Sequence, residues 1–355
     1  MTKIIWNGTS LRQKRNEGYK NSEDEIVSRL IKNGLDITRE CLVPKDVQFI
    51  NNSGIGLAYE SNASERVSSD ILINNRLPHD YQVGSGYSIG FSYWETNKLP
   101  SQWVTRMNQM DEIWTTSLWA KNVFIDSGVI VPVYNFSLGI HKEFFYPILR
   151  TRKSPFTFLS IGSPSTRKNS QVAVDAFIKM FGGKDGYRLL YKSVDCPDAR
   201  LKDAGGGVLP ISSHPQIDII DKDVDLETLS KIYDSVDCLI YPTSGEGWGI
   251  LPYQAIAKGI PTICTNATSC TEYAEMSVPL DYKWSNYNMS GIYEDTGTWA
   301  EPDFDDLCDK MLYVVNNYDE IAKKTYDNAT AQFETMTWDW AAKGYYDRLC
   351  QILNQ

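Results

Sequence analysis

The sequence predicts an α/β protein with two domains, and three observations lead to this prediction. Short apolar segments, such as 156–161 and 188–193, alternate with segments of helical pattern along the chain, which is typical of α/β folds. The length of 355 residues fits two domains of medium size better than one. With 42% hydrophobic and 12% aromatic residues, the chain has enough apolar side chains for packed cores.

The charge balance and the cysteine pattern argue against several classes of protein. A net charge of −10 argues against a general nucleic-acid binder or a protein that binds anionic membranes. The seven cysteines show no CxxC spacing and the three histidines are scattered, so we expect neither a disulfide framework nor a metal site. Residues 1–10 lack the apolar core of a signal peptide, and no segment is apolar for the length of a membrane span. We therefore expect a cytoplasmic protein without a membrane segment.

The first predicted elements are a strand at 3–7 and a helix at 23–33, with Asn21 or Ser22 as the helix cap. Between them lies a polar loop in which the basic residues Arg12, Lys14 and Arg15 stand close together. Each of these charges taken singly fits a solvated loop. As a group they also fit an anionic acceptor, and that alternative stays open.

Two further strands of the first half lead into candidate functional residues. The strand at 70–74 runs into a loop with His79, and the strand at 87–93 leads to Glu95. After these come a helix at 101–110, a strand at 112–115 and a helix that ends at 126. A lone histidine is more often structural than functional. Glu95 fits a structural hydrogen bond and a role in a catalytic cleft equally well.

A basic pair in the second half is placed to bind an anion. After the strand at 156–161 the chain runs through Gly162 and Ser163 to Arg167 and Lys168, just before a helix begins. A positive charge beside a helix N-terminus opposes the helix dipole, so it is unfavourable unless an anion binds there. We therefore expect Arg167 and Lys168 to hold phosphate groups rather than to form a solvated loop.

The stretch 238–265 contains a strand, a turn of small residues, a helix and a second strand in immediate succession. Such a turn directs backbone N–H groups and a helix N-terminus at one place, as in phosphate sites. Glu246 stands in this turn, where an acid needs a polar partner such as sugar hydroxyls. Gln254 lies two helical turns further on, so both side chains can face one ligand. Trp248 stands between two glycines, where a large ring has to pack or stack.

This stretch resembles the donor-site signature of the retaining glycosyltransferases of family 4, whose two Rossmann-like domains face a cleft in the architecture called GT-B. The family signature is a Glu, seven residues and a second Glu, and here Glu246 and Gln254 stand at these positions. Similar family phrases occur at YWET (93–96), DEIW (111–114) and WAEPDFDDL (299–307). The resemblance implies an acceptor-side domain at 1–150, a nucleotide-sugar-binding domain at 151–336 and a helix at 337–355 that crosses back to the first domain.

The resemblance also implies a role for each candidate residue. Glu246 would orient the transferred sugar, and Gln254 would bind the ribose of the nucleotide. Arg167 and Lys168 would hold the diphosphate, with Arg167 supplying the charge that relatives carry at the position of Ser163. The remaining residues assigned to nucleotide-sugar binding are Gly162, Ser163, Lys192, Gly247, Trp248, Gly249, Ile250 and Leu251. Many relatives carry a histidine where this chain has Tyr-Trp-Glu at 93–95, so Glu95 or His79 would act in its place.

The implied function is transfer of a sugar from a nucleotide-sugar to a hydroxyl, with retention at the anomeric carbon and without a metal or other cofactor. The acceptor would be a saccharide or glycoconjugate, bound by the basic loop and His79. One alternative is a hydroxymethylated base in DNA, which the basic loop favours and the net charge disfavours. Another is a protein that binds a sugar nucleotide without catalysis, indicated by Gln254, Ser163 and Leu138 at positions where relatives differ.

Overall fold

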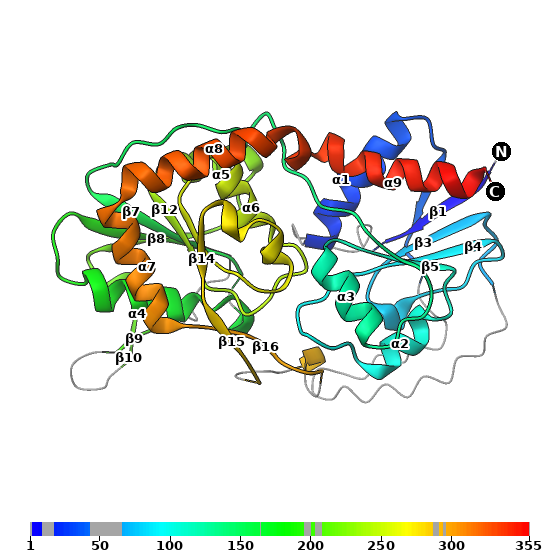
Figure 1. Ribbon diagram of the computed structural model, residues 1–355, viewed down its shortest axis with the longest axis horizontal. Helices are drawn as coiled ribbons and strands as arrows, with labels where there is room; N and C mark the ends of the chain where they lie inside the picture. Colours follow the sequence, from blue (N-terminus) through cyan, green and yellow to red (C-terminus); the bar gives the residue numbers. More distant parts are fainter. Residues whose placement is uncertain are drawn as a thin grey trace. The chain divides into compact units, whose positions relative to one another are not determined.

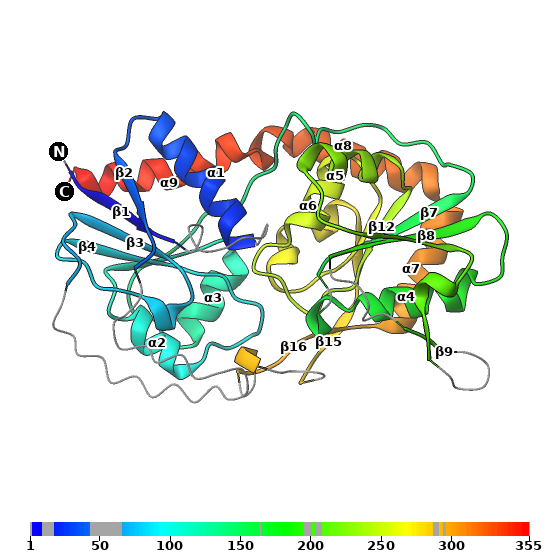
Figure 2. The ribbon, with the colours of Figure 1, turned by 180° about the vertical axis from the view of Figure 1, so that it is seen from behind.

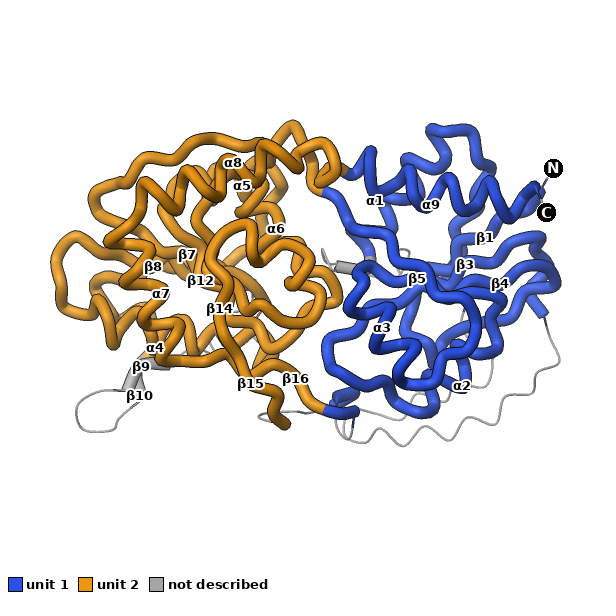
Figure 3. The backbone as a smooth tube through the Cα atoms, in the orientation of Figure 1, with its two compact units in different colours: residues 1–139, 290–297, 338–355 blue, residues 140–289, 298–337 orange. Residues whose placement is uncertain are grey.

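A computed structural model describes residues 2–8, 18–42, 66–163, 165–194, 200–202, 208–286, 291–293 and 296–354. The chain forms two compact units, coloured separately in Figure 3, and each contains a six-stranded sheet. Unit 1 comprises residues 1–139, 290–297 and 338–355, and unit 2 comprises 140–289 and 298–337. Residues 140–150, which the sequence analysis placed in the first domain, thus belong to unit 2. Arg150 is anchored there, because its guanidinium donates to Asp234 and to the carbonyl of Lys258.

The sheet of unit 1 has the strand order β2-β1-β3-β4-β5-β6, and all neighbouring strands are parallel. The strands are β1 (Ile4–Asn7), β2 (Ile37–Glu40), β3 (Ile71–Asn75), β4 (Tyr87–Phe91), β5 (Glu112–Thr115) and β6 (Val133–Asn135). The order reverses between β1 and β3, as in flavodoxin-like folds. The helices α1 (Gly18–Lys32) and α9 (Trp338–Leu353) cover one face, and α2 (Ser101–Met107) and α3 (Leu118–Asp126) cover the other (Figures 1 and 2).

Helix α1 begins at Gly18, five residues before the predicted start. The expected cap, Ser22, lies inside the helix and is buried. Its hydroxyl forms a hydrogen bond of 2.7 Å with the hydroxyl of Tyr93. Ser22 therefore makes a tertiary contact with the segment after β4, which local capping rules could not reveal.

A buried ion pair attaches the C-terminal helix to the sheet of unit 1. Glu112 of β5 is fully buried and accepts hydrogen bonds from Trp114 Nε1 at 2.6 Å and Tyr87 Oη at 2.9 Å. Arg348 of α9 completes the group, with Nε 3.1 Å from Oε2 of Glu112 and a second bond from its terminal nitrogen. Tyr345, one turn earlier, packs against Trp114 with ring centroids 5.6 Å apart. The helix thus adds charge pairing and aromatic packing to one face of the sheet.

The sheet of unit 2 has the order β11-β8-β7-β12-β13-β14, again with parallel neighbours. The strands are β7 (Phe156–Ile161), β8 (Tyr187–Ser193), β11 (Ile217–Asp221), β12 (Cys238–Tyr241), β13 (Thr262–Thr265) and β14 (Val278–Leu280). This is the order of the dinucleotide-binding Rossmann sheet, and its direction reverses between β7 and β12. The prediction of two Rossmann-like domains is confirmed.

Helices cover both faces of the second sheet (Figures 1 and 2). They are α4 (Ser170–Phe181) and α7 (Phe304–Asn316) on one face, and α5 (Leu226–Asp234) and α6 (Ile250–Ala257) on the other, with α8 (Tyr318–Met336) packed along α6. Two antiparallel pairs lie outside the sheet, β9 (Arg200–Lys202) with β10 (Val208–Pro210) and β15 (Tyr282–Ser285) with β16 (Trp299–Pro302). Within the described residues no helix combines the length and the hydropathy that crossing a membrane requires.

Candidate functional site

The turn that follows β12 carries the centre of the site, and a neighbouring loop holds it in place. This loop follows β7 and contains a short 3-10 helix, Thr166–Lys168. The N–H of Ser244 donates to the carbonyl of Arg167 at 2.7 Å. Asn169 donates from Nδ2 to the carbonyl of Pro242 at 2.9 Å and to Ser244 Oγ at 2.8 Å. Two loops that are distant in sequence therefore form one rigid group at the carboxyl ends of β7 and β12, where parallel α/β sheets bind ligands.

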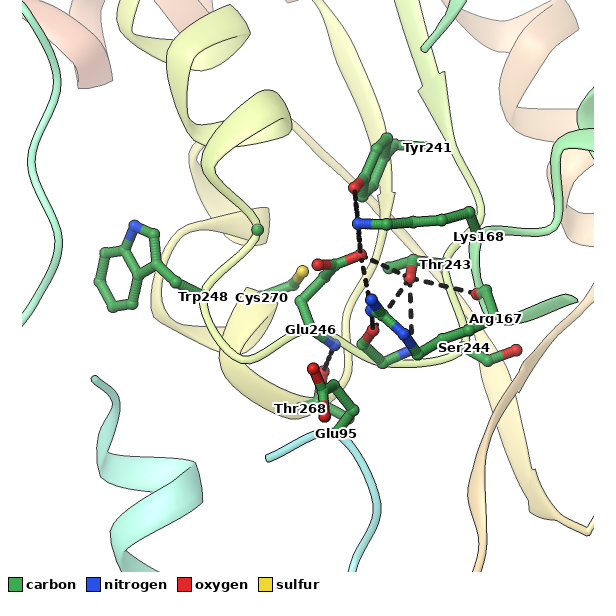
Figure 4. A network of polar contacts seen from close by, with 12 residues as sticks. Glu95, Arg167, Lys168, Tyr241, Thr243, Ser244, Glu246, Trp248, Thr268 and Cys270 are labelled. Atoms are coloured by element: carbon green, nitrogen blue, oxygen red, sulfur yellow. Dashed lines mark hydrogen bonds and ion pairs between the residues drawn. The ribbon is translucent and has the colours of Figure 1, made fainter. Parts of the chain in front are cut away.

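The carboxylate of Glu246 is held by one of its two oxygens (Figure 4). Four groups contact Oε1: Lys168 Nζ at 2.6 Å, Thr243 Oγ1 at 2.8 Å, Tyr241 Oη at 3.0 Å and a guanidinium nitrogen of Arg167 at 3.2 Å. No hydrogen bond from the described part of the chain reaches the second oxygen, Oε2. One oxygen thus fixes the side chain, and the other is left to accept a hydrogen bond from a ligand.

The electrostatics of this group keep Glu246 ionised. Burial alone would raise the pKa of Glu246, but the positive charges of Lys168 and Arg167 outweigh burial and lower this pKa to about 2. The pKa of Lys168 is also lowered, because loss of hydration outweighs the attraction of Glu246. Two basic side chains share one carboxylate, so the group can still attract an anion such as a phosphate.

The backbone around Glu246 is also held by residues outside its own turn. Its N–H donates to Thr268 Oγ1 at 2.9 Å. Gly249 has a φ of 82°, and a Cβ there would lie 2.3 Å from Tyr273 Oη. That hydroxyl lies 2.8 Å from the carbonyl oxygens of both Trp248 and Gly249. Position 249 therefore requires glycine, and Tyr273 holds the turn that leads into α6.

The five predicted turn residues, Gly247, Trp248, Gly249, Ile250 and Leu251, lie in this turn and at the start of α6. The ring of Trp248 is 6% exposed and packs edge-on against Tyr253 and Tyr273, with centroids 5.2 and 5.9 Å apart. In Figure 4 the indole points away from the Glu246 group. The cost of a large ring on a loop is thus offset by aromatic packing.

Gln254 has a buried side-chain amide. Its side chain lies in the second turn of α6 and is 4% exposed. Oε1 of this amide has no partner among the described residues. An unpaired buried acceptor costs about 1–3 kcal/mol, so a ligand that donates a hydrogen bond to it would recover this cost.

Gly162 and Lys192 join the ends of two neighbouring strands beside the basic pair. The N–H of Gly162 donates to the carbonyl of Lys192 at 3.1 Å. Lys192 is buried, and its Nζ donates to the carbonyl of Lys222 at 2.7 Å. A Cβ at Gly162 would lie 3.8 Å from the aliphatic stem of Lys168. Ser163 is exposed, and a guanidinium nitrogen of Arg167 lies 3.2 Å from Glu246 Oε1.

Two other candidate residues, Glu95 and His79, belong to unit 1. Glu95 follows β4 and accepts a hydrogen bond of 3.1 Å from Tyr293. His79 lies with Nε2 3.8 Å from a carboxylate oxygen of Asp80, and its ring is 5.9 Å from that of Trp103. Burial lowers the pKa of His79. The three basic candidates Arg12, Lys14 and Arg15 lie outside the described residues.

Sequence reasoning missed several residues that build the site. Tyr241 and Thr243 both donate to Glu246, while Asn169, Thr268 and Tyr273 hold the loops. The position of Tyr241 at the end of a strand was the one available signal, because strand ends meet at the ligand edge of a parallel sheet. Thr243 lies three residues before Glu246 in the same turn, and the other three depend on contacts between loops. Among the described residues no group of three or more His, Cys, Asp or Glu side chains could hold a metal ion.

Comparisons with known proteins identify the fold. No protein-family model and no curated protein matches the sequence. Among solved structures, sucrose-phosphate synthase from Thermosynechococcus elongatus has a TM-score of 0.66 at 12% identity, over 100% of both chains. Anabaena HepE, solved with UDP and glucose, has a TM-score of 0.63 at 9% identity, over 99% of this chain and 100% of its own. The trehalose 6-phosphate synthase of Burkholderia multivorans has a TM-score of 0.57 at 9% identity, over 80% and 70% of the two chains. The chain has the fold of the GT-B glycosyltransferases, with two Rossmann-like domains.

Proposed function

We propose that the chain is a retaining glycosyltransferase that moves a sugar from a nucleotide-sugar to the hydroxyl of a saccharide or glycoconjugate. The observation that carries this proposal is the asymmetry of the Glu246 carboxylate. Its Oε1 accepts from a lysine, an arginine and two hydroxyls, whereas no described residue donates to Oε2. An acid held in this way accepts hydrogen bonds from the hydroxyls of a sugar and lies beside cations that suit a diphosphate.

In the proposed reaction the bond between the anomeric carbon and the diphosphate oxygen breaks, and a bond from this carbon to the acceptor oxygen forms. Lys168 and Arg167 stabilise the negative charge that develops on the leaving diphosphate. Glu246 orients the sugar through Oε2, and Gln254 accepts a hydrogen bond from a ribose hydroxyl. The departing phosphate takes the proton of the acceptor hydroxyl, so this scheme needs no strong protein base and no metal ion.

The solved neighbours support a UDP-sugar as the first nucleotide-sugar to test. HepE was solved with UDP and glucose, and the other two neighbours are named as sugar-phosphate synthases. No neighbour named above favours DNA as an acceptor. A saccharide acceptor predicts turnover with little salt dependence, whereas a DNA acceptor predicts a log–log slope of about −0.9 per phosphate contact. Replacing Arg12, Lys14 and Arg15 by Gln would flatten that slope in the DNA case alone.

The test is release of nucleoside diphosphate from UDP-, GDP- and ADP-sugars, with and without saccharide acceptors, after a thermal-shift screen of the same compounds. We expect Glu246→Gln to reduce turnover by roughly tenfold to a hundredfold, as for loss of a charged hydrogen bond of about 1.5–3 kcal/mol. Glu275→Gln is the matched control, because Glu275 is an exposed acid of the same unit. Binding of a sugar nucleotide without any release of nucleotide would identify a binding protein instead of an enzyme.

A further inference from the structure

We propose that Asn169 and Thr268 are positioning residues, which hold the turn of Glu246 through backbone conformations that residues other than glycine rarely adopt. This inference rests on the proposed function, because it gives both residues a role in sugar transfer through Glu246. Within the described residues, two that are not glycine have a positive φ, Asn169 with 52° and Thr268 with 55°. They come from different loops of unit 2, and both contact the stretch 242–246.

Thr268 combines a β-branched side chain with a left-handed backbone. This combination is unfavourable, because Cβ then approaches the following carbonyl oxygen. Thr268 is fully buried, and its Oγ1 accepts the N–H of Glu246 at 2.9 Å (Figure 4). The carbonyl of Thr268 in turn accepts a hydrogen bond of 2.7 Å from Thr271 Oγ1. The left-handed conformation thus places a hydroxyl where it satisfies a buried N–H of the turn.

Asn169 departs from the usual behaviour of an asparagine in front of a helix. At this position the backbone is normally extended, and the side chain accepts an N–H of the first helical turn. Asn169 precedes α4 with a φ of 52° and a ψ of 37°, and its side chain forms no such cap. Its Nδ2 donates instead to the carbonyl of Pro242 at 2.9 Å and to Ser244 Oγ at 2.8 Å. The side chain therefore stabilises the turn after β12 rather than its own helix.

Two departures from local conformational preferences thus meet at one turn. Residues in sparsely populated backbone conformations cluster at functional sites, where the surrounding structure keeps them in place. Asn169 and Thr268 fix the turn itself, whereas the four groups on Oε1 fix the carboxylate of Glu246. Both sets of contacts are needed to keep Oε2 at one point relative to a bound sugar.

The effect of these residues should fall on turnover rather than on nucleotide affinity. A shift of the turn displaces the carboxylate of Glu246 and leaves its charge unchanged, together with the charges of Lys168 and Arg167. Free UDP carries no sugar for Glu246 to orient. We therefore expect the affinity for free UDP to stay the same when the turn loosens, while kcat falls.

Three variants at position 268 separate the hydroxyl from the backbone strain. Thr268→Ser keeps the hydroxyl, Thr268→Ala keeps Cβ alone, and Thr268→Gly removes both. We expect Thr268→Ser to retain the normal kcat and the other two to lower kcat about tenfold, because a buried N–H loses its acceptor. Thr268→Gly should melt at a higher temperature than Thr268→Ala, since glycine adopts a positive φ without strain.

Asn169→Gly and Thr262→Ala complete the set. Asn169→Gly allows the left-handed backbone and removes both bonds to the turn, so it should also lower kcat about tenfold. Thr262→Ala is the matched control at the start of β13, where a fully buried hydroxyl donates to the carbonyl of Ile260 at 2.8 Å. It should lower the melting temperature and leave kcat unchanged.

The kinetic results can contradict the inference in two ways. An unchanged kcat in Thr268→Ala would show that the hydroxyl does not position Glu246. An equal loss of kcat in Thr262→Ala would show that any buried hydroxyl of this unit has the same effect. Either result would overturn the inference.

Hydrogen–deuterium exchange separates this inference from the proposed function. Exchange in peptides that span 242–249 should accelerate in Thr268→Ala and Asn169→Gly and stay normal in Thr268→Ser. Unchanged exchange in the first two would overturn the positioning role even in an active enzyme. If the unmodified protein transfers no sugar while exchange responds as expected, the two residues hold the turn and the proposed function is wrong.

Discussion

Replacing Glu246 by Gln should separate two effects of one carboxylate, on stability and on ligand binding. The pKa of Glu246 falls from 4.5 to about 2 in the folded protein, and each tenfold change in proton affinity corresponds to about 1.4 kcal/mol. The ionised carboxylate therefore stabilises the fold by about 3 kcal/mol at pH 7. The amide of Gln is neutral and leaves Lys168 and Arg167 buried without their counter-charge. We expect the variant to lose stability of this size at neutral pH.

The sign of the pH dependence follows from the lowered pKa. A carboxylate with a lowered folded-state pKa stabilises the protein above its unfolded pKa, and this stabilisation disappears as the pH falls from 4.5 towards 2. At pH 3 the difference in the free energy of unfolding between the unmodified protein and Glu246→Gln should therefore shrink to less than half of its value at pH 7. Urea denaturation at pH 7, 4 and 3 measures this difference in the free energy of unfolding, with Glu275→Gln as the control.

For the same variant we expect a gain in UDP affinity, in contrast to its loss of stability. Without the carboxylate no acid of this group competes with an anion for Lys168 and Arg167, so free UDP should bind Glu246→Gln more tightly while the rate of sugar transfer falls. Calorimetry with UDP and a transfer assay measure the two effects. The reasoning would be refuted if Glu246→Gln and the unmodified protein were equally stable at all three pH values. It would also be refuted if the variant bound UDP more weakly and still transferred sugar at the normal rate.

Three further variants test other parts of the structure. Arg348→Met should lower the free energy of unfolding by about 3–5 kcal/mol, because Glu112 stays buried without its charge partner; urea denaturation checks this. Arg167→Ala and Lys168→Ala should each weaken UDP binding in calorimetry. The double variant should lose less binding free energy than the sum of the two single losses, because both charges share one diphosphate. Gln254→Leu should weaken UDP binding about tenfold through loss of a hydrogen bond to ribose, and binding of inorganic pyrophosphate should not change.

Each of these variants has a control or an outcome that contradicts it. Lys343→Met removes an exposed charge from the same helix as Arg348, and it should leave stability unchanged within about 0.5 kcal/mol. Unaltered UDP affinity in both single variants of the basic pair would mean that this pair does not bind the diphosphate. If Gln254→Leu weakened the binding of UDP and of pyrophosphate equally, the proposed hydrogen bond between Gln254 and the ribose would be wrong.

Local signals were sufficient to predict the fold class and most strands. Apolar runs such as 156–161 and 112–115 coincide with β7 and β5, because buried parallel strands are almost continuously hydrophobic. Helix α8 escaped the sequence analysis. Its buried positions include the small residues Ala322 and Ala329 and the polar Thr325, so its apolar periodicity is weak.

The candidate site could be predicted as a set of residues but not as a geometry. The turn with Glu246 and the basic pair at the start of α4 were both visible in the sequence. Their meeting depends on Asn169, whose side chain joins the two loops. Nor does any local pattern show that both cations reach one oxygen of the carboxylate. For the same reason, the contact of Tyr293 with Glu95 could not be predicted, since 198 positions separate the two residues.

The packing of α9 on unit 1 has a consequence for biosynthesis. The ribosome makes both sheets before it makes residues 338–353, yet Tyr345 of that helix covers Phe91, Trp114 and Phe136. Until α9 emerges, the nascent first unit presents this aromatic surface and the acid of Glu112 without Arg348. Unit 1 therefore reaches its native packing after translation of unit 2, although its own sheet is synthesised first.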